Sequence, residues 1–399
     1  MPAFLYVLAL AVFAQGTSEF MLSGLVPGIA RDLSVPVGAA ASLTSAYAAG
    51  MIVGAPAAAA LSARWPRRRA LAGFLAAFVL VHVAGALTTD FAVLLGTRVV
   101  AAVVNAGFLA VAMSVATALV PAARRGRATA VLLSGVTLSC VAGVPAGALL
   151  GDGWGWRAAF WAVAALCLPA LALVSRSAPT EARHPDGARR AGGAGGAGVP
   201  RLGREVRALW APRVRQALLL AALVNAATFA SFAYLAVIAT DVTGLPEGAV
   251  PALLAAFGAG AFLGVTAAGR ATDGRLGRGL VLLLCALPLG WASLAVTSSS
   301  TLPLFAAAAV QGALSFGAGT ALVTRVLRVA SAAPTLGGSF ATAALNAGAF
   351  AGPLLAAAGT GLTGEAATAA WASAALAAAA AALALPAVRP GRAATPESA

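Results

Sequence analysis

The chain has 399 residues, of which 61% are hydrophobic and only 10% are charged. This composition leaves too little polar surface to cover a water-soluble globule, so it excludes a soluble protein. The formal net charge of +14 would favour a nucleic acid partner in a soluble protein. Here no basic patch with interleaved aromatic residues is present, and arginine-rich loops beside anionic lipid explain the charge.

Twelve apolar stretches succeed one another along the chain. A bilayer core of about 30 Å requires roughly 20 apolar residues of helix. We place the spans at residues 4–26, 38–62, 70–88, 91–119, 126–150, 156–175, 214–239, 248–269, 279–297, 302–323, 335–360 and 366–388. The sequence therefore predicts an all-α membrane protein with twelve transmembrane helices. We expect no cleavage of the first span, because no basic segment precedes it.

The arginine residues indicate how the chain is oriented. Of the 26 basic residues, all of them arginine, 23 lie in connections that follow even-numbered spans or in the C-terminal tail. The other three are Arg31, Arg98 and Arg157. Because loops rich in Lys and Arg stay in the cytoplasm, we expect both termini to be cytoplasmic in a multi-pass protein of the plasma membrane.

The first span contains a carboxylic acid, Glu19. A charged side chain inside the membrane costs at least about 2.5–3.5 kcal/mol and usually faces a cavity or a partner. Gln15, Glu19 and Ser23 are four residues apart, so they form one polar stripe. We predict that Glu19 exchanges protons and that Gln15 and Ser23 contact a substrate. The alternative is a structural acid hydrogen-bonded to a neighbouring helix.

Three further polar residues, His82, Arg98 and Asn105, lie in the third and fourth spans. His82 is more typical of a packed, singly hydrogen-bonded residue than of a proton relay. Arg98 is the only arginine deep inside a span and lies at a depth similar to that of Glu19. We predict that Arg98 pairs with Glu19 or senses its protonation, and that Asn105, on the same helix face, contacts substrate. The alternative is that Arg98 caps backbone carbonyls between helices.

Residues 176–213 form the one long hydrophilic interruption. They separate six spans from six, so we predict an N-terminal bundle over 1–175, a cytoplasmic linker, and a C-terminal bundle with its tail over 214–399. A six-plus-six layout is typical of transporters that bind substrate at the bilayer midplane. Glycines four residues apart, Gly50 with Gly54 and Gly260 with Gly264, favour close helix contacts.

The second half offers neutral polar and aromatic side chains that suit a moderately apolar ligand. Asn225, Thr228, Phe229 and Phe232 share one face of the seventh span. Gln311 with Ser315, and Asn346, add amides and a hydroxyl in later spans. We predict substrate contacts from Asn225, Thr228, Phe229, Phe232, Gln311 and Asn346. Each polar group is equally suited to an interhelical hydrogen bond.

The residues that enzymes and metal sites require are not arranged for either role. The three cysteines lie within apolar spans, so we expect neither a disulfide nor a metal. No nucleophile triad, metal-ligand cluster or phosphate-binding loop appears. We expect a monomer that is not an enzyme, carries no cofactor, binds no nucleic acid, and interacts with lipid, protons and a small-molecule drug.

Segments of the first half resemble motifs of a known family. The stretch GVTLSCVAGVPAGALLGDGWGWRAAFW at 135–161 resembles the antiporter motif of major facilitator drug:proton exporters, with Gly135, Gly143, Pro145 and Gly147 bending the helix and packing it closely. Arg98 matches the fourth-span arginine that the family links to proton coupling. The loop arginines Arg64, Arg67 and Arg68, and Asp273 in the second half, resemble the gating loops.

A closer resemblance is to the actinobacterial chloramphenicol exporters. It rests on FAQGTSEFMLSGLVP at 13–27, NAGFLAV at 105–111 and the fifth-span segment. The resemblance implies a major facilitator fold and proton-driven export of small neutral drugs such as phenicols. A sugar or metabolite exporter on the same fold is the alternative, and a receptor without transport activity is a more distant one.

Overall fold

The computed structural model describes residues 2–62, 65–121, 124–177, 207, 210–270, 273–330 and 337–384. Every long regular element in these ranges is a helix. The first half contains α1 (Ala3–Phe20), α2 (Leu22–Asp32), α3 (Val37–Ser62), α4 (Arg67–Leu87), α5 (Phe91–Ala118), α6 (Arg125–Leu138), the π-helix η2 (Ser139–Gly143), α7 (Val144–Trp154) and α8 (Trp156–Ser177).

The second half has the same kind of architecture. It contains α11 (Pro212–Phe232), α12 (Leu235–Val237), η3 (Ile238–Val242), η4 (Glu247–Ala249), α13 (Val250–Arg270), α14 (Asp273–Thr297), α15 (Thr301–Val329), α16 (Gly337–Thr363) and α17 (Thr368–Ala384). Eleven candidate spans are long and apolar enough to cross a membrane, and α17 is a shorter apolar helix. The prediction of an all-α membrane protein is confirmed.

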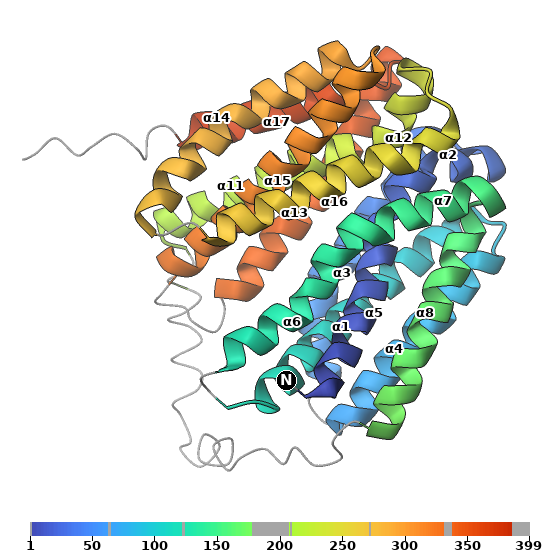
Figure 1. Cartoon of the computed structure of the whole chain (residues 1–399), viewed down its shortest axis with the longest axis vertical. Helices are drawn as coiled ribbons and strands as arrows, with labels where there is room; N and C mark the ends of the chain where they lie inside the picture. The colour runs from blue at the N-terminus through green and yellow to red at the C-terminus, as the bar shows by residue number, and fades with distance from the viewer. Residues whose placement is uncertain are drawn as a thin grey trace, which may run out of the picture.

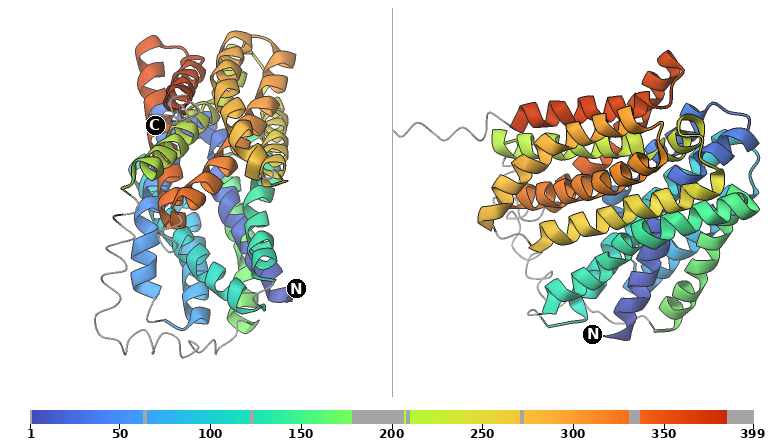
Figure 2. Two further views of the ribbon diagram at one scale, coloured as in Figure 1. Left: turned by 90° about the vertical axis from the view of Figure 1, so that its left-hand side faces the viewer. Right: turned by 45° about the horizontal axis from the view of Figure 1, so that its top comes forward.

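The helices gather into two groups, which we call the N-terminal bundle (α1 to α8) and the C-terminal bundle (α11 to α17). Figure 1 shows the two bundles close together at the end that carries α2, α7 and α12, and apart at the end that carries the N-terminus. Figure 2 shows the same divergence from a second direction. We call the end at which α8 finishes and α11 begins the linker side, and the other end the closed side.

Three main sets of contacts join the bundles. Helix α3 packs along α16, α13 packs on η2 and α7, and α2 touches α12. A hydrogen bond of 2.7 Å from Ser45 Oγ to the Phe350 carbonyl crosses the first of these contacts. The backbone of Gly258 in α13 lies directly against that of Cys140 in η2, which brings the two helices together without intervening side chains.

The first span is interrupted where the sequence predicts one continuous helix. Met21 separates α1 from α2, and the amide of Gly24 donates to the carbonyl of Met21 rather than to that of Phe20. Ser23 Oγ donates to the freed Phe20 carbonyl over 3.0 Å. Pro27 lies within α2 and cannot bond regularly to the turn before it. The break therefore has its own internal hydrogen bond.

Glycines create the closest helix contacts, as the sequence predicts. Gly50 and Gly54 face the backbone of α5 near Val99 and Val103, and Gly260 and Gly264 face α15 near Ala309 and Ala313. A side chain at any of the four would meet neighbouring backbone. These contacts tie α3 to α5 and α13 to α15, and α3 and α13 in turn contact the other bundle.

Candidate functional site

A cavity of about 470 Å³ lies between the two bundles. Its walls come from α1, α3, α5 and α6 on one side and from α11, α15 and α16 on the other. It extends from Glu19 to Thr324 and Thr342, which lie near the linker-side ends of α15 and α16. Its size falls in the usual range for small-molecule sites, about 300–1,000 Å³.

Six of the predicted site residues line this cavity together: Glu19, Asn105, Asn225, Thr228, Phe229 and Asn346. The structure adds lining residues that the sequence analysis did not select, namely Phe20, Phe316, Thr320, Thr324 and Thr342. The threonines were detectable in part, because Thr320 with Thr324 and Thr342 with Asn346 are each four residues apart and so share a helix face.

Four predicted substrate contacts do not line this cavity. Gln15 is buried, and neither atom of its amide has a hydrogen-bond partner in the described residues. Ser23 bonds across the break in the first span. Gln311 turns to α14, where it donates to the Leu287 carbonyl over 3.3 Å and packs on Gly290. Phe232 packs between Phe229 and Phe257.

Aromatic rings bound the cavity at the level of Glu19. Phe20 of the N-terminal bundle stacks near Phe229 of the C-terminal bundle, with ring centres 6.1 Å apart. Phe232 and Phe257 continue the row at 6.0 and 4.8 Å spacings, and Phe316 ends it at 6.1 Å from Phe257. The cavity thus offers aromatic faces beside hydroxyl and amide groups, a lining suited to an aryl compound with a few polar substituents.

Glu19 is the single acidic residue among the lining residues. Its side chain is half-buried, and it makes no hydrogen bond or ion pair with the part of the chain that the structure describes. Its neighbours in the lining are Phe20 and Asn105. An acid placed on the wall of a cavity without a fixed partner is able to exchange a proton with whatever enters.

Arg98 forms no ion pair with Glu19 in the described residues, so the pairing we predicted is not seen, whereas the alternative, a bond to a backbone carbonyl of another helix, is present. Its side chain is 1% exposed, and its two terminal nitrogens donate to Ser18, Nη1 to Oγ over 3.0 Å and Nη2 to the carbonyl over 2.7 Å. The guanidinium also lies over the Tyr47 ring, 4.7 Å from its centre. The depth of a residue along a helix can be predicted from the sequence, but the direction of its side chain cannot. Here Ser18, the residue before Glu19, is the partner of Arg98 that we expected Glu19 to be.

His82 joins this cluster from α4. Ser18 Oγ and His82 Nε2 are 2.6 Å apart, and His82 Nδ1 donates to the Phe78 carbonyl over 2.8 Å. The imidazole packs 4.2 Å from the Phe78 ring centre and is 1% exposed. The residue is packed, as predicted, but it is hydrogen-bonded through both ring nitrogens rather than one.

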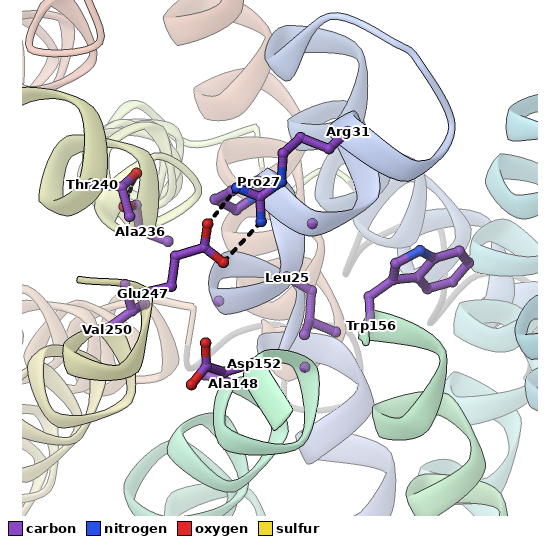
Figure 3. Close-up of a pocket in the computed structure, with 13 residues that line it drawn as sticks. Leu25, Pro27, Arg31, Ala148, Asp152, Trp156, Ala236, Thr240, Glu247 and Val250 are labelled. Atoms are coloured by element: carbon purple, nitrogen blue, oxygen red, sulfur yellow. Dashed lines mark hydrogen bonds and ion pairs between the residues drawn. The ribbon is translucent and has the colours of Figure 1, made fainter. Parts of the chain in front are cut away.

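Ion pairs join residues on the closed side. Arg31 of α2 forms a two-pronged pair with Glu247 of η4, which links the two bundles (Figure 3). Arg157 of α8 pairs with Asp32 and also donates to the Thr88 carbonyl over 2.9 Å. Hydrogen bonds from Arg157 and from Trp156 lower the pKa of the Asp32 carboxyl. Two of the three arginines outside the linker-side set thus have acidic partners.

The predicted motif glycines pack the fifth span against the first. Gly135 faces Ala9 and Phe13, Gly143 faces Thr17, and Gly147 faces Met21. Between them the helix widens into η2, and Pro145 follows in the first turn of α7. These residues therefore hold the helix that carries Glu19.

The predicted loop residues are placed only in part. Arg68 donates to the Ser175 carbonyl at the end of α8, and Arg67 begins α4. Arg64 lies outside the described residues, and Asp273 begins α14 with its side chain undescribed.

Several known proteins are similar to this chain. A chloramphenicol resistance protein of Streptomyces lividans is 55% identical over 91% of this chain and 90% of its own length. An inner membrane transport protein of Escherichia coli K12 is 34% identical over 86% of this chain and 85% of its own. A chloramphenicol efflux pump of Mycobacterium tuberculosis is 34% identical over 70% and 65%, respectively.

The fold is similar to that of a solved peptide transporter, with a TM-score of 0.71 at 15% identity, over 97% of this chain and 93% of that one. The sequence model of the Major Facilitator Superfamily matches residues 8–273. The chain therefore belongs to the Major Facilitator Superfamily of membrane transporters.

Proposed function

We propose that this protein is a proton-driven exporter of small, neutral, largely apolar drugs, and that chloramphenicol and related phenicols are its substrates. The observation that carries the proposal is the cavity between the bundles, which combines aromatic rings, neutral amides and a single carboxylic acid. The identity of 55% to a chloramphenicol resistance protein supports the choice of drug.

The lining suits an uncharged aryl amide. Phe20, Phe229 and Phe316 offer ring faces for an aromatic group. Asn225 uses its amide nitrogen to donate to the Leu345 carbonyl over 2.6 Å, which leaves its oxygen to accept from a ligand hydroxyl or amide. Apolar pockets discriminate weakly between related compounds, so several phenicols should be moved.

The linker side is assigned to the cytoplasm and the protein to the plasma membrane. This assignment rests on the arginine asymmetry of the loops. We assign residues 1–175 and 214–399 to two bundles that move relative to each other, and residues 176–213 to the linker between them. The transporter is assigned as a monomer. In this orientation the cavity faces the cytoplasm, where an exporter collects its substrate, and the Arg31–Glu247 pair lies on the closed, outer side.

Proton coupling is assigned to Glu19 with Arg98 beside it. One proton that crosses about 150 mV releases roughly 3.5 kcal/mol, which sustains a gradient of about 300-fold for a neutral drug. Glu19 is the one acid of the cavity lining, so proton and drug meet in the same space. Binding of the proton then affects binding of the drug, and binding of the drug affects binding of the proton.

Export assays with a Glu19→Gln variant test this function. In an exporter-deficient bacterial host, the wild-type chain should lower chloramphenicol accumulation, and collapse of the proton gradient should abolish the difference. Glu19→Gln should stop uphill export while drug exchange continues, because shape is kept and the titrating group is lost. Unchanged phenicol accumulation with expulsion of a sugar would contradict the proposed substrate, and uphill export by Glu19→Gln would contradict the coupling.

A further inference from the structure

We propose that His82 is a positioning residue for proton coupling: through Ser18 it fixes the Arg98 guanidinium on the backbone of α1, beside Glu19 but not bonded to it. The inference rests on the proposed proton-driven function, in which Glu19 binds and releases the proton. It adds two residues, His82 and Ser18, that do not line the cavity.

The hydrogen-bond directions in this cluster follow from chemistry. The Phe78 carbonyl can only accept, so His82 Nδ1, 2.8 Å away, must carry a proton. Arg98 can only donate, so Ser18 Oγ accepts from Nη1 over 3.0 Å. Ser18 has one hydroxyl proton left to place, and the acceptor 2.6 Å away is His82 Nε2.

A neutral imidazole is required for this chain of bonds. The Ser18 hydroxyl can donate to Nε2 only if that nitrogen is unprotonated. A charged imidazole would also place a second buried cation beside Arg98, and like charges in a low-dielectric interior repel strongly. His82 therefore acts as a hydrogen-bond acceptor that orients Ser18, and it does so with no change of its own charge.

Arg98 is held by few bonds, so each of them matters. Two nitrogens bond to Ser18, while the Arg98 Nε–H has no partner in the described residues. A buried donor without a partner costs about 1–3 kcal/mol, and a carboxylate would satisfy it. Loss of the Ser18 hydroxyl orientation should therefore release the guanidinium toward Glu19.

The position of Arg98 decides when Glu19 is charged. A cation in direct contact favours the carboxylate and would retain it, whereas a cation held one residue away exerts a weaker attraction. Besides Arg98, the titratable groups that interact with Glu19 are Tyr47 of α3 and Cys140 of η2, while His82 interacts with Arg98. None of these is a second acid, so the Arg98 position is the main electrostatic control on the Glu19 carboxyl.

Purified protein in liposomes allows the inference to be tested with two transport measurements. Uphill chloramphenicol uptake driven by an imposed pH gradient requires proton release, and drug–drug exchange does not. His82→Leu should reduce uphill uptake at neutral pH about tenfold or more, move its pH dependence toward lower pH, and leave exchange near the wild-type rate. His82→Gln should recover most of the uptake, because its amide can both accept from Ser18 and donate to Phe78.

Two further variants separate positioning from packing. Ser18→Ala removes the same link from the α1 side and should reproduce the His82→Leu profile, even if His82→Leu itself does not fold. Phe74→Leu changes a buried residue about two turns from His82 on α4 and should leave the pH dependence unchanged. Infrared difference spectra give a direct reading of the protonated Glu19 carboxyl, identified by its absence in Glu19→Gln.

The outcomes are distinct. Wild-type uptake and pH dependence in both His82→Leu and Ser18→Ala would overturn the inference. A second result would also overturn the inference: His82→Gln and His82→Leu lose uptake and exchange equally, and the titration of Glu19 is unshifted in Ser18→Ala. If the wild-type protein exchanges no phenicol, the proposed substrate is wrong, and the infrared titration of Glu19 in these variants still decides the role of His82.

Discussion

At the scale of single residues, Arg98 shows why geometry matters more than charge. Its planar fork bonds to Oγ and to the carbonyl of Ser18, and its flat face covers Tyr47. A lysine ammonium is compact and cannot reproduce both the fork and the stacking.

We therefore expect Arg98→Lys to impair uphill export and to cost about 1.5–3 kcal/mol of stability, the value of a lost bond to a charged group. Export assays and thermal unfolding in detergent measure the two effects. Arg69→Lys, the same change at an exposed position of α4, is the control. Normal export by Arg98→Lys would show that Arg98 contributes only its positive charge.

Gly319 gives a test of the cavity itself. It lines the cavity, and no atom would lie within 4 Å of a Cβ added there. Gly319→Leu should fill part of the 470 Å³, since its Cβ would meet no neighbouring atom, and a helical leucine in place of glycine gains up to about 1 kcal/mol.

Drug binding should therefore weaken while stability holds or rises, a combination that general damage cannot produce. Equilibrium binding of labelled chloramphenicol and thermal unfolding measure these properties. Gly279→Leu, also a helical glycine with open space but outside the cavity, is the matched control. Unchanged drug binding by Gly319→Leu would exclude this cavity as the substrate site.

At the scale of elements, the sequence predicts spans well because hydropathy depends on composition, whereas the site depends on helix rotation. The predicted fourth span, 91–119, differs by one residue from α5. Gln311 shows the opposite case: its polar neighbour Ser315 lines the cavity, but Gly290 leaves room for the amide on α14. That room belongs to another helix and leaves no trace in the sequence around Gln311.

The first span adds a second reason. Of its polar stripe, Glu19 lines the cavity, but Gln15 and Ser23 do not, and Ser23 lies beyond the break at Met21. Pro27 indicates that the helix is distorted. It does not indicate where the helix breaks, because that depends on a side-chain hydroxyl, here that of Ser23, bonding to the free Phe20 carbonyl. The fold was thus predictable from the sequence, and the site only in part.

The packing of the fifth span on the first gives a prediction at this scale. A side chain at Gly143 would come within 3.0 Å of the Thr17 side chain in α1. Gly143→Ala should push α1 and η2 apart at a cost of about 1–3 kcal/mol, and it should slow export because Glu19 lies half a turn beyond Thr17. Gly153→Ala, in the same span with open space around it, should be harmless. Thermal unfolding and export rates report both; equal behaviour of the two variants would contradict this account.

At the scale of the whole molecule, charge and closure are connected. The arginines that depart from the loop asymmetry, Arg31 and Arg157, have acidic partners on the closed side, and only Arg31 joins the two bundles. Arg157 and Asp32 belong to one bundle and so stiffen it. The hydrogen bonds that lower the Asp32 pKa keep that pair charged in mildly acidic surroundings, so a pH drop on the closed side should leave it intact.

The Arg31–Glu247 pair should bias the protein toward the state described here. Both side chains are exposed, 62% and 49%, so solvent screens the pair and its contribution is at most about 1 kcal/mol. Glu247→Gln should therefore raise the population that is open on the closed side by no more than about fivefold. The exchanged double variant Arg31→Glu with Glu247→Arg should restore the original distribution, because the attraction is kept with its ends reversed.

Distances between spin labels on the linker-side ends of α6 and α15 report the distribution: they should shorten in Glu247→Gln and return in the exchanged variant. Shortening in both would show that the side chains act by shape, and no shortening in Glu247→Gln would assign closure to the packing of α3 on α16 and of α13 on α7.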